Sequence, residues 1–156
     1  MTATVSRHRK PAPVATPRDS ATTLNRSDVQ VDIDGLFPRN GATTVGPPPS
    51  EIEIAFIQRW IREIAIWRKT PNTTRSSYGL KHDVEKWSVT LGETFAQVDR
   101  HGREWSDTRH YVGNGAFIVA MQREGYTATR CSPGSPNAFF NASYEHAPSE
   151  QPRRAA

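Results

Sequence analysis

Residues 50–69 carry the clearest structural signal in this chain. The segment opens on Ser50-Glu51-Ile52-Glu53, a capping-box pattern in which the side chains of the serine and the second glutamate each bond the backbone amide of the other. Isoleucine and tryptophan then recur at helical spacing over a wide arc, and Pro71 ends the run after two basic residues. The pattern predicts a helix from Ser50 to about Lys69. A helix with so wide an apolar surface lies at the centre of a core or forms a contact between copies of the chain.

Two further segments have the periodicity of helices. The first runs from about Ser77, and Gly92 is a suitable C-terminal cap for it. Its apolar side chains fall at i, i+4, i+7 and i+11, which places them on one stripe: Leu80, Val84, Trp87 and Leu91. The second helix is expected to begin with Asn114 as its N-cap and to end at Gly125.

The segments between and after these helices give weaker signals. Residues 93–100 suit either a short third helix or a strand over Phe95–Val98. The mixed-charge stretch that follows suits solvent-exposed surface, in which Trp105 alone has to be buried. Ser132–Pro136 must form a loop because of its prolines and glycine. We expect the small and aromatic residues of 138–142 to fold back onto the core.

The two ends of the chain have a different composition. Residues 1–49 hold seven of the twelve prolines and keep neither a helical nor a strand period for long, so we expect them to be disordered. An apolar island at residues 29–37 interrupts this tail and begins with strand-like alternation. The island either packs onto the domain or is a short motif that adds a strand to a partner's sheet. The sequence thus predicts a folded domain at residues 50–143, followed by a second disordered tail at residues 144–156.

These segments together predict a mainly α-helical fold, a small domain of three or four helices between disordered tails. Hydrophobic residues make up 35% of the chain and the mean hydropathy is −0.67, which is low for a chain folded throughout. No apolar run approaches the roughly 20 residues that span a bilayer, and no apolar region of a signal peptide is present. We therefore expect a cytoplasmic protein. Cys131 is the single cysteine, so the chain has no intramolecular disulfide.

Three segments invite a functional interpretation. In Tyr78-Gly79-Leu80-Lys81-His82, the lysine can pair with Glu85 along the helix, whereas the histidine has no metal-ligand or dyad spacing to Asp83 and is interpreted as an ordinary histidine. Tyr111-Val112-Gly113-Asn114-Gly115 exposes amides that can bind an anion, but its spacing is neither a dinucleotide fingerprint nor a P-loop, and a plain helix start is the simpler interpretation. Ser135-Pro136-Asn137 opens either a recognition loop with exposed aromatic residues or a segment pinned to the core.

The chain contains residue types that enzymes use in catalysis, but they do not occur at the spacings of a catalytic or metal-binding motif. Cys131, His110 and Asp107 would supply a nucleophile, a base and an acid, but the cysteine lies in an irregular segment without a helix N-terminus to lower its pKa. No two histidines have the His-x-x-x-His spacing of a helical metal site. We therefore expect no enzymatic activity, no catalytic residues, no bound metal and no cofactor.

The segments Tyr78–His82, Tyr111–Ile118 and Ser135–Asn141, taken together, resemble small proteins carried by bacteriophages and mobile elements. The resemblance covers roughly residues 76–141, and the stretch between Trp87 and Arg109 departs from it as an insertion. It implies a bacterial or viral cytoplasmic setting. It implies no known activity and no catalytic residues.

Two functions fit these features. The first is a non-enzymatic interaction module that acts on a protein partner or on itself. Its expected contact residues come from the three segments: Tyr78, Lys81, His82, Tyr111, Asn114, Phe117 and Asn137.

The second function is a nucleic-acid-binding accessory or regulatory protein, because the net charge is +4 and the pI is about 9.6. The basic excess is spread along the chain, and only the N-terminus has a local basic cluster. The expected phosphate contacts are Arg7, Arg9, Lys10, Lys81, Lys86, Arg109, Arg123 and Arg130. Salt dependence separates the two functions, since phosphate binding weakens steeply as salt rises.

Overall fold

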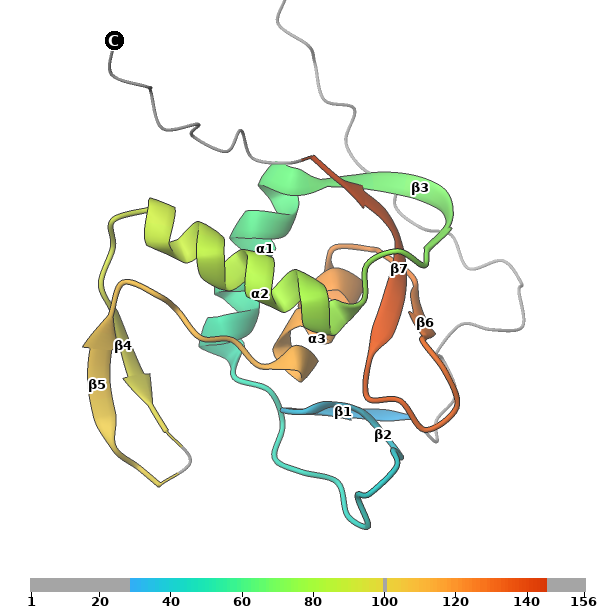
Figure 1. The fold of residues 1–156 in the computed structure, drawn as a ribbon, viewed down its shortest axis with the longest axis horizontal. Helices are drawn as coiled ribbons and strands as arrows, with labels where there is room; N and C mark the ends of the chain where they lie inside the picture. Colours follow the sequence, from blue (N-terminus) through green and yellow to red (C-terminus); the bar gives the residue numbers. More distant parts are fainter. Residues whose placement is uncertain (1–28, 100, 146–156) are drawn as a thin grey trace, which may run out of the picture.

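The computed structural model describes residues 29–99 and 101–145, and within them the fold is mixed α/β (Figure 1). Three helices account for 33% of these residues and seven strands, in three small antiparallel sheets, for 28%. The elements are β1 (Gln30–Asp32), β2 (Gly35–Phe37), α1 (Glu51–Ile64), β3 (Ala65–Asn72), α2 (Ser77–Thr90), β4 (Phe95–Val98), β5 (Glu104–Asp107), α3 (Asn114–Arg123), β6 (Ala128–Arg130) and β7 (Ala138–Tyr144). The prediction of a mainly helical domain is therefore wrong.

The first predicted helix forms but is shorter than expected. α1 ends at Ile64, and the next residues leave the helix as strand β3, which pairs antiparallel with β7 so that Trp67 faces Ala142. The sequence keeps its helical periodicity for a few residues after Ile64. In the structure, however, the backbone N–H and C=O groups of these residues bond to β7, and this tertiary pairing overrides the local helical preference. Ser50 is the N-cap, yet its side chain makes no capping hydrogen bond. The carboxylate of Glu53 accepts instead from the amide of Gly113 at 2.8 Å.

The second and third helices lie close to their predicted positions. α2 buries the predicted stripe at Leu80 and Val84, both 0% exposed. Gly92 follows the C-cap with φ of +65°, the left-handed conformation that glycine tolerates. α3 takes Gly113 rather than the predicted Asn114 as its N-cap. Asn114 is the first helical residue instead, and its side chain is thereby free to reach out of the helix.

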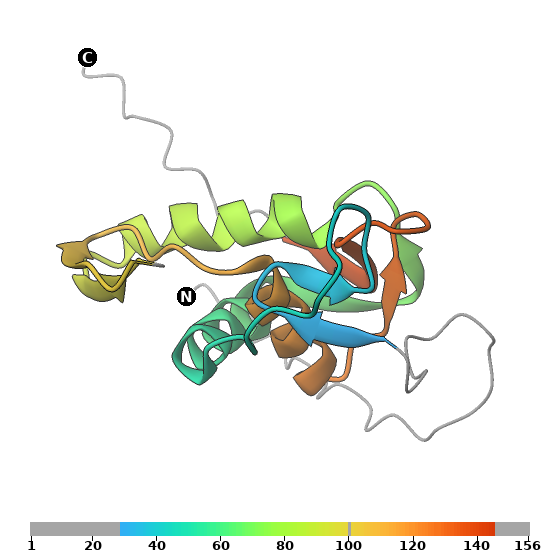
Figure 2. The same cartoon turned by 90° about the horizontal axis from the view of Figure 1, so that it is seen from below.

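The segment after α2 is a strand rather than a helix. β4 pairs with β5 in a hairpin at the end of α2 farthest from the sheet that contains β7 (Figures 1 and 2). Of the two structures that the sequence allowed here, the strand is the one observed. The expected burial of Trp105 is wrong, because its side chain lies on this hairpin and is 39% exposed.

The apolar island near the N-terminal side packs onto the domain, as the first of its two interpretations predicts. β1 and β2 form a hairpin beside α3 (Figure 2), and Leu36 is 0% exposed. The fold therefore takes in residues before Ser50, the predicted start. Buried Asp32 holds the segment between β2 and α1 in place. Its carboxylate accepts from the guanidinium of Arg39 at 2.8 and 2.9 Å and from the amide of Gly46 at 2.7 Å.

The core lies between α1, α3 and the three-stranded sheet of order β3-β7-β6. Ala138, Phe140 and Ala142 alternate along β7 and are 0% exposed, which confirms that this segment folds back onto the core. Phe140 meets the edge of Phe117 with a centroid separation of 5.8 Å. Within the described ranges, none of the helices has the length and apolar character needed to cross a bilayer. The predicted terminal tails, with Arg7, Arg9 and Lys10, lie outside the described residues except for residues 29–49, 144 and 145.

Candidate functional site

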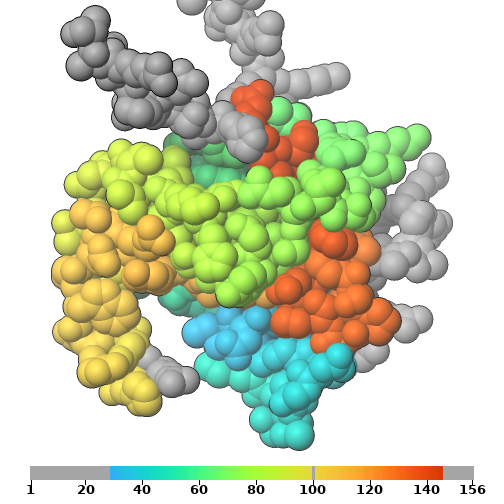
Figure 3. Space-filling view, in the orientation of Figure 1, coloured from blue at the N-terminus to red at the C-terminus, as the bar shows by residue number. Residues whose placement is uncertain are grey.

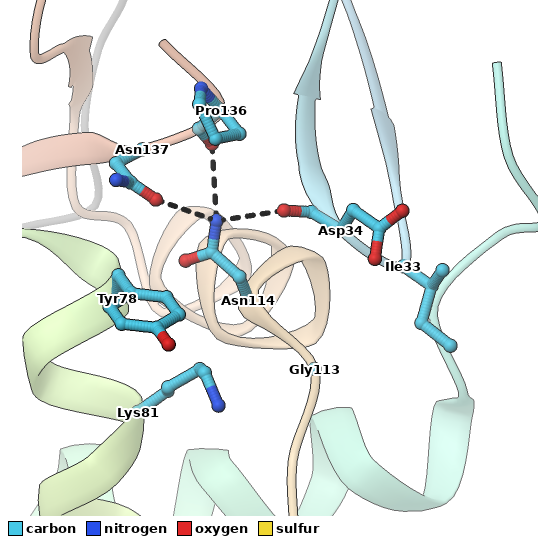
Figure 4. Close-up of a pocket in the computed structure, with 8 residues that line it drawn as sticks. All are labelled: Ile33, Asp34, Tyr78, Lys81, Gly113, Asn114, Pro136 and Asn137. Atoms are coloured by element: carbon cyan, nitrogen blue, oxygen red, sulfur yellow. Dashed lines mark hydrogen bonds between the residues drawn. The ribbon is translucent and has the colours of Figure 1, made fainter. Parts of the chain in front are cut away.

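An open pocket of about 490 Å³ lies where α2, the start of α3, the β1–β2 hairpin and the segment before β7 meet. Figure 3 shows this junction on the surface, where blue hairpin atoms meet the green atoms of α2 and the red-orange atoms near β7. Its walls come from four stretches of sequence, and Figure 4 shows them as sticks: Ile33, Asp34, Tyr78, Lys81, Gly113, Asn114, Pro136 and Asn137.

The two glycines at the start of α3 allow the β1–β2 hairpin to approach the helix. A Cβ at Gly115 would lie 1.7 Å from the carbonyl oxygen of Asp32, and one at Gly113 would lie 2.9 Å from that of Ile33. The amide of Gly115 donates to the Ile33 carbonyl at 3.2 Å, and the amide of Gly113 donates to Glu53. The amides of both glycines are therefore already bonded to acceptors of the protein. The Gly-x-Gly pattern serves backbone packing at a helix start.

The side chain of Asn114 joins three segments at the back of the pocket. Its amide nitrogen donates to the carbonyls of Asp34 at 3.0 Å and Pro136 at 3.1 Å, and to the side-chain oxygen of Asn137 at 3.1 Å (Figure 4). Two of these acceptors are backbone carbonyls, which only accept, so the amide nitrogen and not the oxygen must face them.

This orientation leaves the oxygen Oδ1 of Asn114 on the Tyr78 side of the pocket (Figure 4). Asn114 is only 5% exposed, and its Oδ1 is buried without a hydrogen-bond partner among the residues that the structure describes. A buried acceptor without a donor costs about 1–3 kcal/mol. The protein therefore holds an unmet hydrogen-bond acceptor at the wall of its pocket.

The α2 wall carries the predicted pair of Lys81 with Glu85, together with a pair of His82 with Glu85 that the sequence analysis did not predict. The buried carboxylate of Glu85 accepts from Lys81 Nζ at 3.1 Å and pairs with His82 Nδ1 at 2.8 Å. Burial raises the pKa of Glu85, but the bonds from His82, Lys81 and the Val112 amide outweigh burial, so that its pKa lies below the ordinary value. The i, i+3 spacing of His82 and Glu85 is the signal that would have revealed this pair.

Tyr78 forms the exposed part of the same wall. Its side chain is 52% exposed, its ring meets the edge of His82 at a centroid distance of 4.8 Å, and Lys81 Nζ lies 5.2 Å from its centroid. These two ring contacts hold the side chain within the described part of the protein. Exposed side chains of this kind change rotamer on the picosecond to nanosecond scale.

The surroundings of the pocket are acidic. Six charged residues line it or bond directly to a lining residue, four carboxylates against two cations: Asp32, Asp34, Glu53 and Glu85 against Arg39 and Lys81. Lys81 is already engaged by Glu85 and by the Val112 carbonyl at 3.3 Å. The carboxylate of Asp34 has an exposed fraction of 70%, and one of its oxygens, Oδ2, accepts from the guanidinium of Arg39 at 3.2 Å.

The structure brings four of the seven predicted contact residues into this pocket: Tyr78, Lys81, Asn114 and Asn137. His82 stands just outside it, against Tyr78. Tyr111 is exposed but does not line it. Phe117 is 0% exposed in the core, so the prediction that it contacts a partner is wrong for the fold as it stands. Sequence reasoning missed Ile33 and Asp34, because only tertiary packing brings the hairpin to α3.

The residues expected to contact phosphate do not form one surface. Among those described, Lys86 pairs with Asp83 at 3.9 Å, and Arg123 at the end of α3 pairs with Glu51 at 2.6 Å. Arg130 on β6 donates to the carbonyls of Pro38 and Ser135. Arg109 follows β5, and Lys81 lies in the acidic pocket. These groups are distributed over different elements and are mostly bonded to acceptors of the protein.

The remaining chemical groups lie apart from the pocket. Burial raises the pKa of the Cys131 thiol, which disfavours its thiolate. His110 packs between the rings of Phe95 and Phe56, with centroid distances of 4.8 and 4.5 Å, and burial lowers its pKa. Among the described residues no group of three or more His, Cys, Asp or Glu side chains is placed to hold a metal ion.

No protein-family model, curated protein or solved structure matches this chain. The interpretation of the pocket therefore depends on its own geometry.

Proposed function

We propose that this protein is a non-enzymatic interaction module that binds a protein partner through the pocket between α2, α3 and the β1–β2 hairpin. One observation carries the proposal. Three stretches of sequence that were singled out independently, around Tyr78, Asn114 and Asn137, converge on a single pocket whose wall holds an unmet acceptor. Core packing alone requires neither an exposed tyrosine nor a buried amide oxygen without a donor.

The charge around the pocket favours a protein partner over a nucleic acid. Carboxylates outnumber cations there, so a phosphate group would be repelled. The described basic residues at Lys86, Arg123 and Arg130 bond to the protein and lie on separate elements. A phosphate-binding surface requires free cations gathered on one face. The cytoplasmic setting and the link to bacteriophages or mobile elements belong to the same proposal and rest on the sequence resemblance.

A matched pair of tyrosine variants tests the proposal, because Tyr78 lines the pocket and Tyr111 does not, while both are about half exposed. The tagged full chain, Tyr78→Ala and Tyr111→Ala are used to capture partners from a lysate of the source organism. We expect a partner that the wild type and Tyr111→Ala retain and that Tyr78→Ala loses. Equal capture by all three proteins would contradict the proposal.

Light scattering after size-exclusion chromatography, with and without random double-stranded DNA at low and moderate salt, tests the alternative. We expect no change of mass with DNA. A salt-sensitive complex that Lys86→Glu weakens would replace the proposal with a nucleic-acid function.

A further inference from the structure

We propose that the pocket takes the side chain of an arginine from the protein partner, with its guanidinium bonded to Asn114 Oδ1 and stacked on the ring of Tyr78, in the negative field to which Asp34 contributes. This inference rests on the proposed function and adds the chemistry of the group that is recognised. It follows from a hydrogen-bond acceptor in the pocket that has no donor among the described residues.

The pocket contains an acceptor without a partner, so a ligand must supply hydrogen-bond donors. Among the described residues, Asn114 Oδ1 is buried without a donor, and three acceptors around the amide nitrogen fix its orientation. The carboxylate of Asp34 pairs with Arg39 and points away from Asn114 (Figure 4), so it adds negative charge near the pocket rather than a second acceptor beside Oδ1. A guanidinium carries five N–H donors in a planar fork and no acceptor, so it can bond Oδ1 and still present its flat face to a ring.

The shape and polarity of the walls fit the same side chain. The ring of Tyr78 offers a flat face on which a guanidinium stacks, and Figure 4 shows it beside Asn114. Ile33, which is 38% exposed, and Pro136 supply apolar surface for the methylene groups of the stem. A lysine ammonium is compact and strongly hydrated, and it lacks the planar group that stacks on an aromatic ring while donating a hydrogen bond at its edge.

The cation that already lines the pocket does not prevent this binding. Lys81 donates to Glu85 and to the Val112 carbonyl, and its side chain is only 14% exposed. Glu53 lies on the other side of Gly113 and adds a further carboxylate. The surroundings therefore remain acidic enough to attract a positive group and to repel a phosphate or a carboxylate.

Access to Asn114 Oδ1 requires a small movement, because the atom is buried in the free protein. The exposed ring of Tyr78 is the part of the wall that can turn aside, since ring contacts to His82 and Lys81 hold it. Binding thus replaces a buried acceptor without a donor by a charge-assisted hydrogen bond.

Nuclear magnetic resonance with short peptides tests the inference on the full chain. The probes are acetyl-Gly-Arg-Gly-amide, the same peptide with citrulline, which keeps the shape without the charge, and the same peptide with glutamate. We expect the arginine peptide to shift the side-chain amide signals of Asn114 and the backbone amide of Gly113. We expect the citrulline peptide to bind about tenfold more weakly, as the loss of one charged hydrogen bond predicts.

Two variants and two controls complete the test. Tyr78→Ala is expected to weaken the arginine peptide about tenfold, and Asp34→Asn, which removes an exposed nearby charge, about twofold to fivefold. Glu93→Gln, a half-exposed carboxylate paired with Arg59 away from the pocket, and Tyr111→Ala are expected to leave the affinity unchanged. Amide spectra of each variant show that the fold is retained.

The outcomes separate this inference from the proposed function. Equal binding of the arginine and citrulline peptides, or no shift at Asn114, would overturn the arginine assignment. The proposed function would still stand if partner capture remains sensitive to Tyr78→Ala. Preferential binding of the glutamate peptide or of a thymidine oligonucleotide at the same signals would overturn both.

Discussion

Replacing Gly115 by alanine tests the packing that forms the pocket. An alanine in a helix is ordinarily more favourable than a glycine by about 1 kcal/mol. Here the added Cβ would lie 1.7 Å from the carbonyl oxygen of Asp32, whereas ordinary contact begins at 3.4 Å. Both groups belong to backbone, so a side-chain rotation cannot relieve the overlap. The β1–β2 hairpin and α3 must move apart by about 1.7 Å, the difference between these two distances.

The size of the effect follows from the contacts that this movement breaks. The Gly115 amide loses its bond to the Ile33 carbonyl, now 3.2 Å, and Asn114 loses its bond to the Asp34 carbonyl, now 3.0 Å. Each such bond contributes about 1 kcal/mol, and an overpacked contact costs about 1–3 kcal/mol. After the helical preference of alanine is subtracted, we expect Gly115→Ala to lower the free energy of unfolding by about 2–4 kcal/mol.

Gly79→Ala in α2 is the matched control. The nearest group to its added Cβ, Ser76 Oγ, lies 4.0 Å away, so we expect this variant to be more stable by up to about 1 kcal/mol. Urea unfolding, followed by the fluorescence of buried Trp60 and Trp87, measures both variants. Opposite signs support the packing argument. Changes of equal sign and size in the two variants would refute it.

Two further predictions concern buried charge. Arg39→Ala leaves the carboxylate of Asp32 buried without its cation, and we expect a loss of about 3 kcal/mol in urea unfolding. Arg103→Ala, which removes a pair with a 79% exposed arginine, should change stability by less than about 1 kcal/mol, and equal losses would contradict the reasoning. Because burial lowers the pKa of His110 below 6.5, the unfolded chain binds a proton before the folded one does, so stability falls as the pH drops below about 6.5. The urea midpoint of His110→Phe should depend less on pH over that range, and an unchanged pH profile would show that His110 is not the group responsible.

The sequence alone determined the elements whose signals lie within a few residues. α2 follows from its apolar stripe and from Gly92, and the loop from Ser132 to Pro136 follows from its prolines and glycine. These features hold in the structure because a helical period and a turn residue act on neighbouring backbone groups. The sequence also indicated two of the segments that line the candidate site, because Tyr78 and Asn137 lie in segments that the sequence analysis interpreted as functional.

Tertiary structure decided the strands and the use of each side chain in the pocket. Residues 65–69 keep a helical pattern but become part of β3, because β7 supplies a ladder from residues far along the chain. Asn114 suggested a helix cap, yet its side chain bonds Asp34, 80 positions away, and Pro136, 22 positions away. Distant pairings such as these leave no periodic trace in the sequence, since each depends on how the whole chain packs. Asn114 Oδ1 lies at the wall of the pocket only because this packing fixes the orientation of the Asn114 side-chain amide.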